Sequence, residues 1–305
     1  PKTMFAVFLF ILAFACAYAV PGRALAAEVF FNTPETRYHV EDGVICRYEL
    51  VDAEEILKNK ATIFTAPDGF RIIAFDAARA RGIPGRLRPR QWAGVGEAGT
   101  GAETGKAVET EDSTLLAVIL DNGEVRLLCI YNETEEGIWF YKDMTPYQPW
   151  KVLFADVDDD GVLDLCLGVW KESPLHPVLA KRLFIYRLAP GLPPKWLGSR
   201  LSKPMTEFYF FHNGEKTHLV STELTRDGGE CVNVYYWDQF GFTGYGEYHL
   251  LREGEAVTEG YLWKNGELQK SLLITDNGKP SGRLPKNLWK GFINDEEEFI
   301  NDGGE

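Results

Sequence analysis

The residues with the clearest chemical potential lie in one acidic run of the chain, between Asp156 and Asp164. Acids stand at relative positions 1, 3, 5 and 9 of this run, and Gly161 stands at position 6. Calcium takes several oxygen ligands, and this spacing wraps carboxylates and one backbone carbonyl around a single ion. The predicted calcium ligands are Asp156, Asp158, Asp160, Val162 through its carbonyl, and Asp164.

The acidic run is not that of an EF-hand. An EF-hand requires a bidentate acid at relative position 12, which is Leu167 here, inside a β-like apolar run. A strand–loop–strand calcium site is therefore expected. The alternative is an acidic hairpin tip that binds no metal, and the mutual repulsion of closely spaced carboxylates without a counterion argues against it.

A second group of residues is basic and aromatic within an acidic chain. The predicted ligand-binding residues are His176, Lys181, Arg182, Trp196 and Arg200, with Lys195 and Lys203 close in sequence. Arginine offers paired donors and tryptophan a stacking face, so this cluster could hold a carboxylate, a phosphate or an anionic polysaccharide. The alternative is that these side chains brace packing between sheets and neutralise acidic neighbours.

Common catalytic motifs are missing from the sequence. It contains no G-x-S-x-G, no H-E-x-x-H, no P-loop and no dinucleotide-binding glycine pattern. Adjacent acids such as Glu135 and Glu136 point to opposite sides of a strand, so they could not flank a glycosidic bond together. A non-catalytic binding or scaffolding role is favoured, and the alternative is a polysaccharide-active hydrolase or lyase that uses the cluster from His176 to Lys203.

The charge of the chain and its cysteine pattern argue against nucleic-acid binding and against common zinc or redox sites. The 305 residues carry a formal net charge of −13, which argues against nucleic acid as a partner. No C-x-x-C pair is present, so common zinc and redox motifs are absent. Four cysteines beyond the N-terminal segment lie in β-like apolar runs and are expected to be buried small hydrophobic residues, with a structural disulfide among them as the alternative. They are Cys46, Cys129, Cys166 and Cys231.

The N-terminal segment has the order of a secretory signal. Lys2 precedes an apolar run from Met4 to Val20, and small residues at Ala24 and Ala26 satisfy a cleavage site. Residues 1–26 are therefore expected to be a signal peptide, with a retained membrane anchor as the alternative. The chain is expected to be secreted or held at the cell envelope, with no transmembrane span after cleavage and an envelope protein or anionic polysaccharide as its partner. Residues 294–305 are expected to be an acidic tail.

The elements that must position these residues are predicted to be strands. Short apolar or alternating runs are separated by turn signals, among them Asn-Gly pairs that favour two-residue hairpin turns. These pairs begin at Asn122, Asn213, Asn265 and Asn277. One short helix is expected from Asp52 to Asn59.

A rough repeat of about 50 to 56 residues predicts an all-β, β-propeller-like fold of four or five four-stranded units. An irregular β-sandwich is the alternative. Residues 27–293 are expected to be one domain with a flexible insertion at about 77–113. The last, partial repeat is expected to be completed by N-terminal strands near 44–50 and 61–64. The clearest copies of the repeat begin near Phe70, Trp150 and Glu207.

At Asp156, Asp158, Asp160, Gly161 and Asp164 the chain resembles the FG-GAP or VCBS repeat family, whose β-propeller blades carry D-x-D-x-D-G-x-x-D loops. The resemblance implies that calcium is structural, as in integrin α-chain propellers, and that ligands bind elsewhere. The other repeats lack the acid series: the upstream one begins Asp76-Ala77-Ala78-Arg79, so one ion is expected. The stretches around Trp150, 176–182 and 196–202 are also similar to uncharacterised secreted proteins of this repeat class in Firmicutes-type bacteria.

Overall fold

The structure is a computed structural model. It describes residues 30–33, 36–51, 56–80, 113–133, 137–173, 176–189, 191–198, 201–264, 267–285 and 288. The predicted signal peptide, the predicted acidic tail and most of the predicted insertion lie outside these residues. β5 continues to Ala80 and β6 begins at Ser113, so the first residues assigned to the insertion belong to a strand.

The chain divides into two compact units at Pro67 and Asp68. The first unit contains one antiparallel sheet with the order β1-β2-β3-β4. Its strands are β1 (Phe30–Thr33), β2 (Thr36–Glu41), β3 (Val44–Val51) and β4 (Ile56–Thr65). Tyr38, Ile45, Cys46 and Phe64 are its buried hydrophobic residues in the described range.

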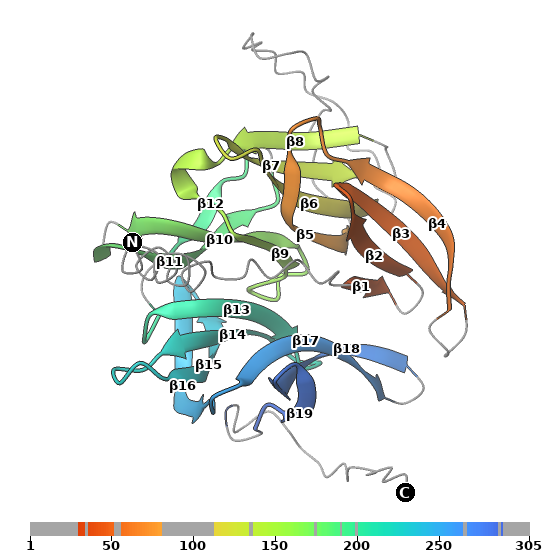
Figure 1. Ribbon diagram of the computed structural model, residues 1–305. Helices are drawn as coiled ribbons and strands as arrows, with labels where there is room; N and C mark the ends of the chain where they lie inside the picture. Colours follow the sequence, from red (N-terminus) through yellow and green to blue (C-terminus); the bar gives the residue numbers. More distant parts are fainter. Residues whose placement is uncertain are drawn as a thin grey trace, which may run out of the picture. The chain divides into compact units, whose positions relative to one another are not determined.

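The second unit contains four consecutive antiparallel sheets (Figure 1). The first is formed by β5 (Arg71–Ala80), β6 (Ser113–Asp121), β7 (Arg126–Asn132) and β8 (Gly137–Asp143). The next is formed by β9 (Lys151–Ala155), β10 (Asp164–Ser173), β11 (His176–Arg187) and β12 (Pro194–Leu197). The third is formed by β13 (Met205–His212), β14 (Thr217–Leu224), β15 (Glu230–Asp238) and β16 (Gly241–Leu250). β17 (Glu255–Lys264), β18 (Glu267–Asp276) and β19 (Lys279–Arg283) form the last, and a 3-10 helix (Thr145–Tyr147) precedes β9.

The core of the second unit lies between successive sheets. One hydrophobic cluster joins the sheets of β5–β8 and β9–β12, a second joins β9–β12 and β13–β16, and a third joins β13–β16 and β17–β19. The second strand of a sheet is covered on both faces: residues 115–120 of β6 are all fully buried. Continuous apolar runs such as Leu115–Leu120 therefore form strands that are covered on both sides rather than on one.

Consecutive four-stranded meanders packed face to face are the blades of a β-propeller. The predicted fold class is thus confirmed, and the described strands form five sheets, the upper of the two predicted blade numbers. The three repeats that the sequence shows most clearly coincide with β5–β8, β9–β12 and β13–β16.

Two expectations about the N-terminal half were wrong. The strands near 44–50 and 61–64 pair with each other as β3 and β4 and not with the last sheet. The short helix expected from Asp52 to Asn59 is wrong for residues 56–59, which belong to β4. Residues 52–55 lie outside the described residues. The apolar pattern of Ile56 and Leu57 suits either element, and pairing with Val51 and Leu50 of β3 selects the strand.

The turn and cysteine expectations fit the structure. Asn122, Asn213 and Asn277 lie in the turns β6–β7, β13–β14 and β18–β19, and the pair at Asn265 lies outside the described residues. The four cysteines are buried and free, as expected of small core residues. Among the described residues, no helix has the length and apolar character to cross a membrane.

Candidate functional site

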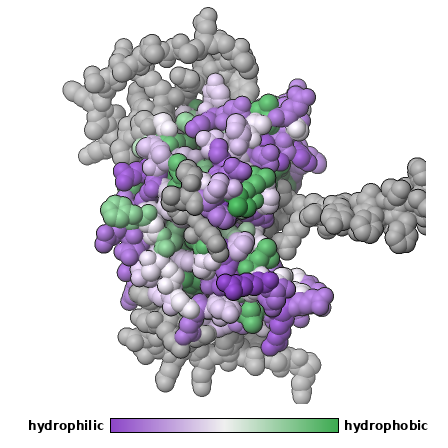
Figure 2. Space-filling model, turned by 90° about the vertical axis from the view of Figure 1, so that its left-hand side faces the viewer, coloured by the Kyte–Doolittle hydropathy of each residue, from purple (hydrophilic) through white to green (hydrophobic). Residues whose placement is uncertain are grey.

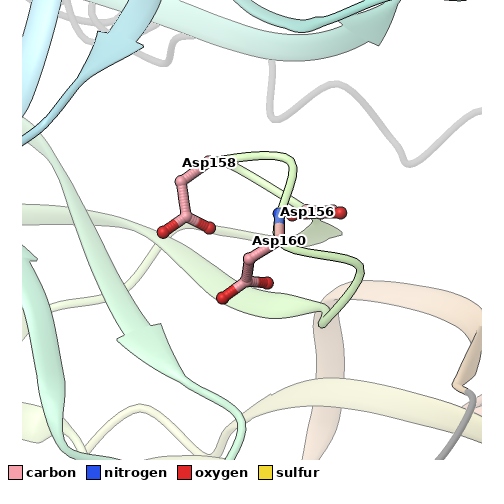
Figure 3. Close-up of side chains that lie close together, drawn as sticks. All are labelled: Asp156, Asp158 and Asp160. Carbon is pink, nitrogen blue, oxygen red and sulfur yellow. Dashed lines mark hydrogen bonds between the residues drawn. The ribbon is translucent and has the colours of Figure 1, made fainter.

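The acidic run forms the loop that joins β9 to β10. Asp156, Asp158 and Asp160 each offer a carboxylate oxygen, and these oxygens lie within 4.8 Å of one another. Figure 3 shows the three side chains on this one loop, with those of Asp158 and Asp160 extending toward the same side. The chain turns sharply through backbone of positive φ at Asp159 (57°) and Gly161 (83°), as the position-6 glycine predicts.

Backbone amides of the loop fix the carboxylates. Asp156 Oδ1 accepts a hydrogen bond from Asp160 N at 3.0 Å, and its Oδ2 accepts one from Gly161 N at 2.8 Å. Asp160 Oδ1 accepts a hydrogen bond from Val162 N at 2.9 Å. Burial raises the pKa of Asp156, and its neighbours Asp160 and Asp159 raise it further, although the two amide bonds lower it.

The fifth predicted ligand, Asp164, faces a lysine. Lys195 of β12 is 5% exposed, and its Nζ lies 2.7 Å from Asp164 Oδ2 and 2.5 Å from Asp158 Oδ1. Burial raises the pKa of Asp164 to about 6, although the Lys195 ammonium acts in the opposite direction. Burial lowers the pKa of Lys195, but its bonds to Asp158 and Asp164 outweigh this and leave the pKa raised. Lys195 therefore belongs to the acidic loop rather than to the basic cluster in which the sequence placed it.

Asp159, which the spacing does not assign as a ligand, connects the loop to the next sheet. Thr217 N, at the start of β14, donates to Asp159 Oδ1 at 2.9 Å and to Oδ2 at 3.2 Å. A similar bond joins the preceding pair of sheets, where Phe154 N of β9 donates to Asp76 Oδ2 of β5 at 2.7 Å. The acids of this region thus have two kinds of position: some converge within the loop, and others bind neighbouring sheets.

The residues of the loop fit a hard cation. Calcium–oxygen distances are about 2.3–2.6 Å, so two ligands on opposite sides of one ion are about 5 Å apart. The three convergent carboxylates satisfy this limit. The loop carries the acids Asp156, Asp158, Asp159, Asp160 and Asp164. Lys195 is the lysine or arginine that pairs with them in the described residues, so a large negative charge remains for a bound cation to neutralise.

In the predicted basic cluster, the side chain of Arg182 hydrogen-bonds to backbone carbonyl groups. Its side chain is buried and donates to the carbonyl oxygens of Lys171 at 2.7 Å, His176 at 2.8 Å and Val178 at 2.7 Å. Its Nη2 also lies 3.0 Å from His176 Nδ1. Arg182 and His176 are therefore brought together, but the guanidinium ties the β10–β11 hairpin together.

Lys181 is likewise engaged within the fold. Its Nζ donates to the carbonyl oxygen of Thr206 in β13 at 2.7 Å and lies 4.2 Å from the centroid of the Trp150 ring. Burial lowers the pKa of Lys181, and nearby Glu207 partly offsets this. The side chain links β11 to the next sheet.

Trp196 and Lys203 of the predicted cluster contact aromatic rings. Trp196 packs edge-on against Phe242 of β16, with ring centroids 5.2 Å apart. Lys203 lies over the ring of Tyr248 at 4.2 Å, and Arg200 lies outside the described residues. On the face of the molecule shown in Figure 2, hydrophobic side chains are interspersed among hydrophilic ones. Ligand binding by this cluster stays a prediction.

Sequence reasoning missed a buried carboxylate network around Glu223 of β14. Glu223 is 0% exposed and accepts hydrogen bonds from Tyr235 OH at 2.6 Å, Asn233 Nδ2 at 2.9 Å and Ser202 Oγ at 3.0 Å. Lys203 N donates a further bond at 2.9 Å. The network ties the segment before β13 to β14 and β15. The one feature of the sequence that could have indicated this network is the presence of an acid within the apolar run of β14.

No model of a known protein family matches the chain, and no curated protein matches it. The chain is similar to a solved structure described as the structure of Dos1 propeller, with 10% sequence identity and a TM-score of 0.38. The match covers 84% of this chain and 56% of that one, so the chain spans little more than half of that structure's length.

Proposed function

We propose that the chain is a non-catalytic β-propeller that acts as a binding or scaffolding surface at the cell envelope or exterior, and that one calcium ion stabilises it. The observation that carries the proposal is the convergence of Asp156, Asp158 and Asp160 within 4.8 Å on a loop between two strands. Membership of the FG-GAP or VCBS class is part of the proposal, and the spacing of the acid series supports it.

The ion would act on the packing between sheets. Asp156 begins the loop directly after β9, and Asp159 accepts hydrogen bonds from the first residue of β14. An ion that orders the loop would therefore hold in place the Asp159 carboxylate, which accepts the hydrogen bonds from the Thr217 amide. A calcium concentration about 100 times Kd is expected to stabilise the folded chain by about 2.7 kcal/mol.

Thermal unfolding of the full chain with calcium, with magnesium and with a chelator tests the calcium site. Calcium is expected to raise the melting temperature more than magnesium, which demands a stricter octahedral arrangement. The double variant Asp158→Ala/Asp160→Ala is expected to lose the response. Asp159→Asn is the matched control, because it removes one charge from the same loop but keeps an acceptor for Thr217. A chain that ignores calcium, or a double variant that responds normally, would contradict the calcium site.

Export and the absence of catalysis are tested separately. N-terminal sequencing of the protein recovered outside the cells is expected to show a start after Ala26. The purified chain is expected to bind anionic polysaccharides or an envelope protein without consuming them. Turnover of a panel of acidic glycans at ordinary enzyme rates would favour the alternative, a hydrolase or lyase. In the described residues, Lys181 and Arg182 of the cluster proposed for that activity bind backbone carbonyls.

A further inference from the structure

A cavity of about 230 Å³ lies beside the acidic loop. Its lining residues come from the end of β5, from the loop and from the segment after β11: Arg79, Ala80, Asp156, Gly161, Val162, Leu163 and Leu188. The cavity therefore adjoins the loop at Asp156, the first of the convergent carboxylates.

Among the described residues that line the cavity, one is cationic, Arg79. Arg79 is exposed at the rim of the cavity and pairs through its backbone with Thr114 of β6. Within the described residues its guanidinium forms no ion pair and no hydrogen bond. A guanidinium with free paired donors is suited to a carboxylate, which it binds through two parallel hydrogen bonds.

The rest of the wall restricts the ligand. Ala80 and Leu188 are buried, Leu163 packs against the core, and together they give the cavity an apolar side. Sites for drug-sized ligands usually enclose about 300–1,000 Å³, so this cavity admits a smaller group. Asp156 would repel a free anion, but a cation held in the loop would reverse that effect.

We propose that this cavity binds a small carboxylate with an apolar body, which pairs with Arg79 and shares the calcium ion of the acidic loop. The inference rests on the proposed function, because it needs the ion. Arg79 would bind the carboxylate of the ligand, and the apolar wall would contact its hydrocarbon part. The calcium ion would neutralise the negative charge of Asp156. Carboxylate and calcium bind cooperatively, and each raises the affinity for the other by the same factor.

Calorimetric titration of the full chain with 4-methylpentanoate tests the proposal, with 4-methylpentanamide as the neutral analogue. In saturating calcium the acid is expected to bind at least about tenfold more tightly than the amide, since charge-assisted hydrogen bonds are lost in the amide. In chelator the affinity for the acid is expected to fall by about the same factor.

Arg79→Gln is expected to weaken acid binding about tenfold, whereas calcium affinity in carboxylate-free buffer is expected not to fall, because the change removes a positive charge. Arg79→Lys, which keeps the charge but not the paired donors, is expected to be intermediate. Arg226→Gln is the matched control, because it removes the same charge from an exposed turn between β14 and β15.

The outcomes separate the two proposals. If the chain binds no calcium, the proposed calcium site fails and the cavity proposal fails with it. If calcium binds normally but the acid binds Arg79→Gln as well as the unchanged chain, the cavity proposal alone is overturned. Acid binding that depends on Arg79 but not on calcium would overturn the shared ion.

Discussion

At the scale of single residues, Lys195 decides how much charge the acidic loop carries without calcium. Its ammonium pairs with Asp158 and Asp164, which are separated by six positions in the acidic loop. Lys195→Met keeps the length of the apolar stem but leaves both carboxylates without their cation. Removing one partner of a buried pair costs about 3–5 kcal/mol, and the 23% exposure of the Asp158 side chain reduces this, so we expect a loss of about 2–3 kcal/mol.

Urea denaturation in chelator and in calcium measures the effect of Lys195→Met. The loss is expected to be largest in chelator and smaller in calcium, because a bound ion replaces part of the missing positive charge. Lys203→Met is the matched control: Lys203 lies over the Tyr248 ring and is expected to contribute about 0.5–1 kcal/mol in either condition. Equal losses for the two variants would show that Lys195 has no special role in the loop.

Glu223 makes a residue-scale prediction about pH. Burial raises its pKa, and the bonds from Tyr235 and Ser202 only partly offset this. Between the two pKa values, the folded chain keeps a proton on Glu223 that the unfolded chain has already lost. The contribution of Glu223 to the free energy of unfolding is therefore complete below the unfolded pKa of about 4.3, and it falls as pH rises through the folded pKa. The stability of the unchanged chain relative to Glu223→Gln is expected to fall across that window.

Urea denaturation from pH 4 to pH 8 checks this difference. Glu215→Gln, in the exposed β13–β14 turn, controls for removal of one charge. A stability difference between the unchanged chain and Glu223→Gln that stays constant with pH would mean that Glu223 titrates alike in both states.

At the scale of elements, close packing between strands depends on Gly168 in β10. A Cβ at this position would lie 2.7 Å from the Trp150 ring and 3.0 Å from Phe208. Gly168→Ala is therefore expected to lower the free energy of unfolding by about 1–3 kcal/mol through overpacking. Gly282→Ala in β19 is the control, since no atom lies within 4 Å of its Cβ, and its effect is expected to stay below about 0.5 kcal/mol.

Chemical denaturation measures both glycine variants. Because the Trp150 ring is the nearest obstacle, the combined variant Gly168→Ala/Trp150→Leu is expected to lose less than the sum of its two single changes. Strict additivity would contradict the proposed clash. It would also mean that contact with the Trp150 indole does not explain why β10 has a glycine at position 168.

The elements differ in how far the sequence predicts them. Strands β9–β16 follow from alternating or apolar runs between turn residues, and the loop follows from the spacing of Asp156, Asp158 and Asp160. These signals are local. The partner of Asp164 is not: Lys195 is 31 positions away and reaches the loop only because β12 pairs with β11, which pairs with β10. Likewise, alternation marks β3 and β4 as strands but does not say which sheet they join.

At the scale of the whole molecule, burial predicts where the second unit resists opening. β6, β10 and β14 each have neighbours on both sides and long runs of buried residues. β12 and β16 are edge strands of their sheets and are largely half-buried or exposed. Opening free energies rise with buried apolar contact, so the second strand of each sheet is expected to belong to the most stable part of the fold.

Hydrogen exchange with mass spectrometry on the full chain tests this order. Amides of residues 115–120 in β6, 165–169 in β10 and 218–223 in β14 are expected to exchange most slowly, and those of β12 and β16 several tens of times faster, which corresponds to a difference of about 2 kcal/mol in opening free energy. Calcium is expected to slow exchange further at Thr217, whose amide donates to Asp159 of the loop. Uniform protection across the four strands of a sheet would mean that each sheet opens as one cooperative unit, and the burial gradient from β10 to β12 would then carry no difference in stability.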